Sequence, residues 1–142
     1  MKTERTIISP MGRGNGAYVL HKMLESHIKG YRVHDYSARW EYFPLAFPFF
    51  FRKEKPALIH TTLDYGLFFH RSGVPLVLTF NHLVLDSFMQ QYSSWSQRIH
   101  YKTDLLLFTR LSLERADVIT SISKSSANML RTELGFSGPI RI

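Results

Sequence analysis

The stretch RTIISPMGRGNGAYVL, residues 5–20, decides the fold class of this chain. Its β-branched run over residues 5–9 predicts a strand that ends at Pro10, and its apolar spacing predicts a helix over residues 17–28. The segment between them contains Gly12, Gly14 and Gly16. Glycine lets backbone N–H groups approach a bound anion closely, and the helix that follows adds partial positive charge. This glycine loop therefore predicts either a phosphate-binding turn or a tight connection that binds nothing.

Apolar strands and helices alternate outward from this stretch to the end of the chain. Further strands are expected at residues 31–36, 57–61, 75–80, 118–122 and 139–142, further helices at residues 99–115 and 124–134, and a short helix or turn at residues 64–71. Apolar strands separated by helices favour a parallel sheet with helices on both faces. Right-handed crossovers bring the carboxyl ends of such strands to one edge, where these folds bind ligands. We therefore expect residues 1–142 to form one Rossmann-like α/β domain with its site at that edge.

Composition narrows the class of protein. The chain has 142 residues, 44% of them hydrophobic, and it contains no cysteine, which excludes disulfides and thiolate metal sites. Its 18 lysines and arginines exceed its 11 acids, for a net charge of +7, but they are scattered, so we expect no nucleic-acid partner. Three explanations of this positive charge remain open: binding to an anionic membrane surface, binding of a phosphate-bearing ligand, or an excess of basic residues that has no specific role. No apolar run is long enough to span a membrane, and no signal-peptide core follows the N-terminus, so we expect a cytoplasmic location.

Histidines follow two of the expected strands. His82 comes directly after the fourth strand, where an imidazole can donate a hydrogen bond to a ligand and change charge near neutral pH, or can simply satisfy the loop backbone. His60 ends the third strand and could face the same cleft. No third ligand at a metal spacing accompanies these two, so no metal site is predicted. His21 and His27 are expected on the surface of the first helix.

Ser123 and Gly135 frame the last helix. Ser123 is a natural N-cap, and the N–H groups beside it could also hold a phosphate or a sugar hydroxyl. Gly135 predicts a left-handed helix end. Three aromatic side chains outside the strands have faces suited to stacking on sugar rings, namely Trp40, Tyr92 and Trp95.

A phenylalanine-rich segment over residues 43–51 runs into two cations. Aromatic rings beside cations suit the interface of an anionic membrane, and the residues expected to face it are Phe49, Phe50, Arg52 and Lys53. The alternative is a segment that packs in the core and ends at a solvated turn.

The glycine loop also fits a dinucleotide-binding fingerprint. Gly12, Gly14 and Ala17 have the spacing of its three small residues. Asp35 follows Gly12 by 23 residues, near the end of the second strand, where an acid that binds ribose lies in such folds. One half of an NAD-binding oxidoreductase is therefore an alternative.

Taken together, three blocks of sequence resemble the N-terminal domain of the retaining glycosyltransferases of family four, the "group one" enzymes of GT-B fold. The blocks are RTIISPMGRGNGAYVLHKML at residues 5–24, ALIHTT and PLVLTFNHLVLD in the middle, and RLSLERADVITSISKSSANMLRTELGF at residues 110–136. The last block is the most specific, because a long helix, an Ala-Asp-Val-Ile-Thr strand and a serine-led helix that ends in Leu-Gly are typical of this domain. The resemblance covers nearly the whole chain.

The resemblance implies roles for particular residues. The loop near the donor diphosphate corresponds to Gly12, Gly14, Asn15 and Gly16, and the catalytic histidine corresponds to His82. The family commonly has Thr-x-His followed by Asn or Asp, whereas here Asn81 precedes His82, so either side chain could take the ligand-facing place. The residues expected to contact the acceptor or the sugar are Asn81, His82, Trp95 and Ser123.

The resemblance also implies a second lobe. Family enzymes bind a nucleotide-sugar between two lobes, mainly through a C-terminal domain with two glutamates eight positions apart, and no two glutamates of this chain have that spacing. We therefore expect a donor-binding partner domain in cis or in trans, a UDP- or GDP-linked sugar as co-substrate, no other cofactor, and no activity of this chain alone. We also expect a saccharide or lipid-linked acceptor, a role in polysaccharide or glycolipid synthesis, and a place on the inner face of the cell membrane. A non-catalytic partner subunit of a split transferase is a further alternative.

Overall fold

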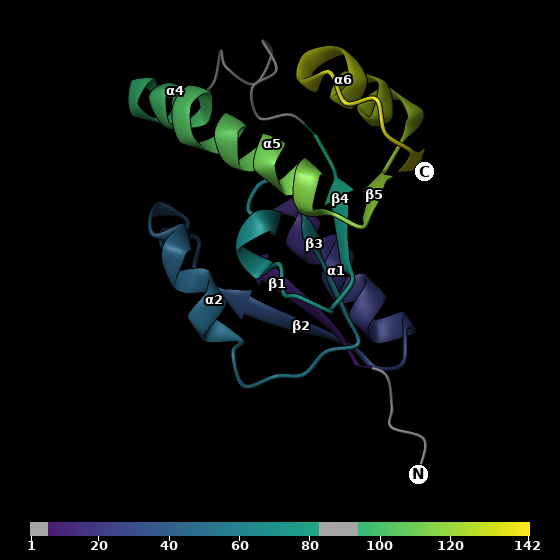
Figure 1. The fold of residues 1–142 in the computed structure, drawn as a ribbon. Coiled ribbons are helices and arrows are strands. Elements are labelled where there is room, and N and C mark those ends of the chain that lie inside the picture. The colour runs from purple at the N-terminus through teal and green to yellow at the C-terminus, as the bar shows by residue number, and fades with distance from the viewer. Residues whose placement is uncertain (1–5, 83–93) are drawn as a thin grey trace.

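Six parallel strands form one sheet in the computed structural model of the chain, which describes residues 6–82 and 94–142 (Figure 1). The strands are β1 (Ile7–Gly12), β2 (Tyr31–Tyr36), β3 (Leu58–Thr62), β4 (Leu76–Phe80), β5 (Val118–Ser121) and β6 (Ile140–Arg141), in the order β2-β1-β3-β4-β5-β6. The chain turns to one side of β1 to form β2 and then crosses to the other side for β3. The carboxyl ends of β1 and β3 therefore border a topological switch point, where such sheets bind ligands.

Helical segments connect the strands, and most lie where the sequence predicts them. They are α1 (Gly16–His27), η1 (Ala38–Tyr42), η2 (Pro44–Ala46), α2 (Phe47–Phe50), η3 (Gly66–Phe69), α4 (Trp95–His100), the π-helical η4 (Tyr101–Leu105), α5 (Leu106–Arg115) and α6 (Lys124–Leu134). The helix expected over residues 99–115 is in fact a continuous run that begins at Trp95 and contains a π-helical segment. Ser123 Oγ accepts the N–H of Ser126, and Gly135 has a φ of 65°, so both predicted ends of α6 are confirmed.

The prediction that the first strand ends at Pro10 is wrong. β1 continues through Pro10 to Gly12 and pairs with β2 along its whole length. Proline is tolerated here because the pairing of β1 with β3 stops at Ile8, so no N–H is needed at Pro10 on that side. In place of a backbone hydrogen bond between β1 and β3, the side-chain hydroxyl of Thr61 donates to the carbonyl oxygen of Pro10 at 2.6 Å.

One face of the sheet, here called the aromatic face, is covered by α2, η3 and α5 (Figure 1). Its sheet residues include Ile59, Leu78, Phe80 and Ile119, which share one side by the alternation of the strands. Phe47 of α2 is fully buried over this face, and its ring stacks on Phe69 with the centroids 5.0 Å apart. Leu130 of α6 joins the same cluster.

The opposite face, here called the polar face, carries Ser9, Tyr31, His60, Thr79 and Thr120, and α1 packs over its β1 and β2 part. A chain of short hydrogen bonds links them. Tyr31 Oη lies 2.8 Å from Nδ1 of His60, Nε2 of His60 lies 2.7 Å from Oγ1 of Thr79, and Oγ1 of Thr79 lies 2.7 Å from Oγ1 of Thr120. The polar face is therefore held by specific contacts as well as by packing.

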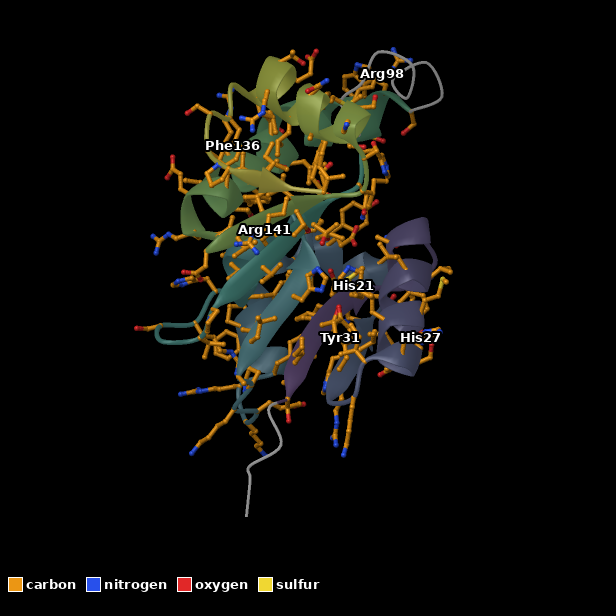
Figure 2. All side chains as sticks on the ribbon, turned by 90° about the vertical axis from the view of Figure 1, so that its right-hand side faces the viewer. His21, His27, Tyr31, Arg98, Phe136 and Arg141 are labelled. Atoms are coloured by element: carbon orange, nitrogen blue, oxygen red, sulfur yellow. The ribbon has the colours of Figure 1, made fainter. Side chains whose placement is uncertain are left out.

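The expectation that His21 lies on the helix surface is wrong. Its side chain is fully buried between α1 and the sheet, with Nδ1 2.7 Å from Oγ of Ser9 and 2.8 Å from Oη of Tyr31 (Figure 2). Burial and the nearby His60 lower the pKa of His21 to about 3, and burial lowers the pKa of His60 to about 4. His27, in contrast, is exposed on the outer side of α1, as predicted (Figure 2).

Candidate functional site

A cavity of about 670 Å³ opens at the carboxyl edge of the sheet, at the switch point between β1 and β3. Four consecutive connections contribute to its wall: the glycine loop after β1, Glu41 after β2, Thr62 to Tyr65 at the end of β3, and Asn81 and His82 after β4. Leu20, Phe80, Leu105 and Ile122 add an apolar lining. Concave sites with a few polar groups on an apolar wall are typical of small-ligand binding.

The glycine loop contributes three of its predicted residues to the cavity. Gly12, Asn15 and Gly16 line it, whereas Gly14 does not belong to the lining residues. Gly14 has a φ of 93°, a left-handed conformation that the turn into α1 requires. Oδ1 of Asn15 accepts the N–H of Tyr18 at 2.8 Å and so caps the helix. The loop is thus a capped strand-to-helix turn whose inner side faces the cavity.

Glu41 reaches the cavity over Gly12. A Cβ atom at Gly12 would lie 2.7 Å from Oε1 of Glu41, closer than carbon and oxygen normally approach. The missing side chain of Gly12 therefore makes room for a carboxyl group from the neighbouring connection. Gly12 thus has a steric role in the cavity wall.

Two carboxyl groups in the cavity have raised pKa values. Burial and the carboxyl of Asp64 raise the pKa of Glu41 to about 7. Burial raises the pKa of Asp64 to about 6, against the opposing effect of positive charge on His82. Tyr36, in the same wall, has its pKa raised by burial and by the charge of Glu41. The raised pKa values bring both carboxyl groups closer to protonation near neutral pH than free carboxyls are, and a protonated carboxyl can donate a hydrogen bond as well as accept one.

Asn81 and His82 both line the cavity. The carbonyl oxygen of Asn81 accepts the hydroxyl of Ser126 at 3.1 Å, which ties the end of β4 to α6. His82 is exposed at the mouth. An imidazole at this place can donate a hydrogen bond to a ligand oxygen.

Other predicted residues lie elsewhere. Ser123 caps α6 and Trp95 begins α4 with its side chain 78% exposed, and neither belongs to the cavity lining. Tyr92 lies outside the described residues. His60 does not face the cleft, because it is held under α1 by Tyr31 and Thr79.

Asp35, the acid of the dinucleotide fingerprint, interacts with other side chains of this chain. Oδ2 of Asp35 lies 3.4 Å from Nε of Arg13 and accepts the hydroxyl of Tyr18 at 3.4 Å. Asp35 does not belong to the cavity lining.

The sequence pattern does not single out Glu41 and Asp64. The signal that could have found them is their position, since each acid follows a strand by a few residues. Among the described residues, no three metal-ligating side chains gather in one place. Within residues 6–82 and 94–142, no helix combines the length and apolar character needed to cross a bilayer.

Comparison with known families agrees with this geometry. The model of Glycosyltransferase Family 4 matches residues 3–142. No curated protein and no solved structure matches the chain. The matched range includes the sheet and the cavity, and a parallel sheet with helices on both faces is the arrangement of one lobe of a GT-B enzyme. This match favours sugar transfer over the NAD-binding alternative. The chain therefore belongs to glycosyltransferase family 4.

Proposed function

We propose that this chain is the acceptor-binding lobe of a retaining glycosyltransferase that uses a nucleotide-sugar. The observation that carries the proposal is the cavity at the switch point, lined by Asn15, Asn81 and His82 beside an apolar wall. Neutral hydrogen-bonding groups next to apolar side chains suit a sugar, because a sugar has hydroxyl groups around its rim and C–H groups on its faces. His82 at the mouth donates a hydrogen bond to the bound saccharide.

The donor diphosphate requires a second lobe, in cis or in trans. Transfer from a nucleotide-sugar leaves negative charge on the departing phosphate, which cations or N–H donors must stabilise. The described lining residues of the cavity include no lysine or arginine. We expect a partner domain to supply these groups, so this chain alone has negligible transferase activity.

The activity test compares two preparations. The chain alone, given UDP- and GDP-linked sugars with a panel of saccharide acceptors, is expected to release no nucleoside diphosphate above background. Addition of a donor-binding domain from the same system is expected to restore transfer. Robust transfer by the chain alone would contradict the two-lobe proposal. His82→Ala in the restored system is expected to lower the rate at least ~100-fold, the usual contribution of a positioned acid–base group.

A second surface supports attachment to an anionic membrane. α2 directs Phe47 into the core, while Phe43, Leu45 and Phe49 are 69%, 78% and 69% exposed. The cations of this surface, Arg39, Arg52 and Lys53, are exposed as well, and Phe50 is 39% exposed. Arg71 fixes the end of α2 by donating to the carbonyl oxygens of Phe51 and Glu54. Exposed rings beside unburied cations suit the boundary between lipid headgroups and acyl chains.

Vesicle flotation tests the membrane proposal. The chain is expected to float with vesicles that contain phosphatidylglycerol and to stay behind with pure phosphatidylcholine. Replacing Phe49, Arg52 and Lys53 by serine is expected to abolish flotation. The matched control replaces Leu107, which is 54% exposed on α5, and the exposed Arg110 and Lys124 by serine. Equal flotation of the two variants would contradict attachment through this surface.

A further inference from the structure

The cavity is acidic although the chain is basic. The chain has 18 lysines and arginines, yet the charged side chains of the described cavity wall, His82 aside, are the two acids Glu41 and Asp64. A phosphate at this wall would meet two carboxyl groups without a compensating lysine or arginine. The half of the cavity that contains these acids is therefore unsuited to the donor diphosphate.

The fold positions the two carboxyl groups in the cavity, but neither group stabilises the fold through a hydrogen bond from a described residue. Glu41 comes from η1 after β2, and Asp64 comes from the connection between β3 and η3. The two strands lie on opposite sides of β1, and the carboxyl of Glu41 comes inward over the bare Cα of Gly12. No hydrogen bond from a described residue reaches either carboxyl group. Half-buried acids that repel each other are unfavourable, and a ligand that donates hydrogen bonds offsets this cost.

We infer that Glu41 and Asp64 together bind an uncharged, hydroxyl-rich saccharide ring and exclude phosphate from their side of the cavity. The inference rests on the proposed function, because it names the chemistry of the acceptor at the same site. The two acids are then specificity-determining residues that contact substrate.

The surrounding residues fit a sugar ring better than a cation. A carboxylate accepts hydrogen bonds from two adjacent hydroxyl groups, and a protonated carboxyl beside it donates one to a hydroxyl oxygen. Asn15, Asn81 and Thr62 add neutral hydrogen-bonding groups around the same space. Leu20 and Phe80 provide apolar surface for the C–H face of a ring. A wall built for an ammonium group would not need this ring of neutral partners.

Titration of the ¹⁵N-labelled chain tests the inference. The probes are the methyl glycosides of glucose, galactose, mannose and glucosamine, together with UDP and inorganic phosphate. At least one neutral glycoside is expected to shift the amide signals of Gly12, Thr62 and Asn81, with a Kd of about 1–10 mM, or roughly −3 to −4 kcal/mol. UDP and phosphate are expected to leave these signals in place.

The matched variants separate the acids from the rest of the cavity. Glu41→Gln with Asp64→Asn keeps the shape and removes the charge, so glycoside affinity is expected to fall about tenfold, the scale of a lost charge-assisted hydrogen bond. Phosphate is then expected to begin shifting the cavity signals. Glu54→Gln is the control, since Glu54 pairs with His34 at 3.1 Å and is not a residue of the cavity wall. Dispersed spectra of all three proteins verify that they are folded.

The outcomes separate this inference from the proposed function. Glycoside binding with equal affinity in the wild type and the double variant would overturn the role of the acids and leave the acceptor-binding proposal standing. Shifts of the wild-type cavity signals by phosphate or UDP would overturn the exclusion of phosphate. A tenfold preference for the glucosamine glycoside would overturn the assignment of an uncharged ring. If no glycoside shifts any cavity signal, both proposals fail.

Discussion

The two faces of the sheet are built by different chemistry. The aromatic face is covered by rings and aliphatic side chains, among them Phe47 and Phe69, that contact several neighbours each. The polar face is held by hydrogen bonds between two histidines, a tyrosine and hydroxyl side chains. Apolar packing is non-directional and independent of pH, whereas hydrogen bonds to histidine depend on geometry and protonation. We therefore expect changes in side-chain volume to destabilise the chain through its aromatic face, and low pH to destabilise it through its polar face.

Removal of the central ring of the aromatic face is expected to have the largest effect. Phe47 is fully buried and lies against Tyr36, Tyr65, Phe68 and Phe69. Phe47→Ala is expected to lower the free energy of unfolding by roughly 3–5 kcal/mol, since such truncations lose transfer energy and leave a cavity. Urea denaturation measures this change. Phe49→Ala, on the exposed side of the same helix, is the control and is expected to change stability by less than ~0.5 kcal/mol.

Added volume on the aromatic face is expected to have the next effect. A Cβ atom at Gly66 would lie 2.5 Å from Cδ2 of Leu78, which is itself fully buried. Gly66→Ala is therefore expected to destabilise the chain by roughly 1–3 kcal/mol through overpacking. Gly16→Ala meets no atom within 4 Å and serves as the control. Equal thermal midpoints of the two variants would show that η3 can move away from β4.

Acid is expected to weaken the polar face. The folded chain holds His21 and His60 neutral, while the unfolded chain protonates them near the ordinary pKa of 6.5. Below this pH the unfolded state binds more protons, so stability falls as the pH falls toward 4. Each histidine is expected to contribute a loss of roughly 2 kcal/mol between pH 7 and pH 5. Denaturation of wild type and His21→Gln across this range measures the loss, and an unchanged slope in the variant would contradict it.

A single hydrogen bond at the end of the polar network is expected to have the smallest effect. Oγ1 of Thr120 lies 2.7 Å from Oγ1 of Thr79. Thr120→Val keeps the shape and removes the bond, so a loss of about 1 kcal/mol is expected in the free energy of unfolding. Thr132→Val, on the exposed side of α6, is the control. A loss no larger than that of the control would show that this end of the network is dispensable.

Local pattern was sufficient for most of the fold and for part of the site. The bounds of β2 and α6 agree with prediction, because apolar strand residues and a capped, glycine-ended helix are local signals. Asn81 and His82 follow a strand directly, and their place at the cavity follows from parallel topology. His21 could not be placed, because histidine counts as polar in a helical pattern and its partners come from other strands.

The acid pair lies beyond what local pattern can predict. Glu41 and Asp64 come close only because β2 and β3 lie on either side of β1 and because Gly12 has no side chain. Neither condition can be read from the residues next to either acid. Local pattern also fails within the phenylalanine-rich segment. Phe47 and Phe51 are buried, while Phe49 is exposed on the same turn of helix. A run of like residues shows that a segment is apolar but does not show which side chains face inward.

The π-helical segment η4 sets the angular relation between α4 and α5. A π turn holds one residue more than an α turn, so winding the same residues of Tyr101–Leu105 as a regular α-helix would shift α4 relative to α5 by one residue. Each residue of an α-helix turns the chain by about 100°, and α4 would rotate by that amount while α5 kept its packing. Trp95 and Ile99, now 78% and 44% exposed on one side of α4, would point in a new direction. The π turn in this segment therefore governs which side chains α4 presents on each of its sides.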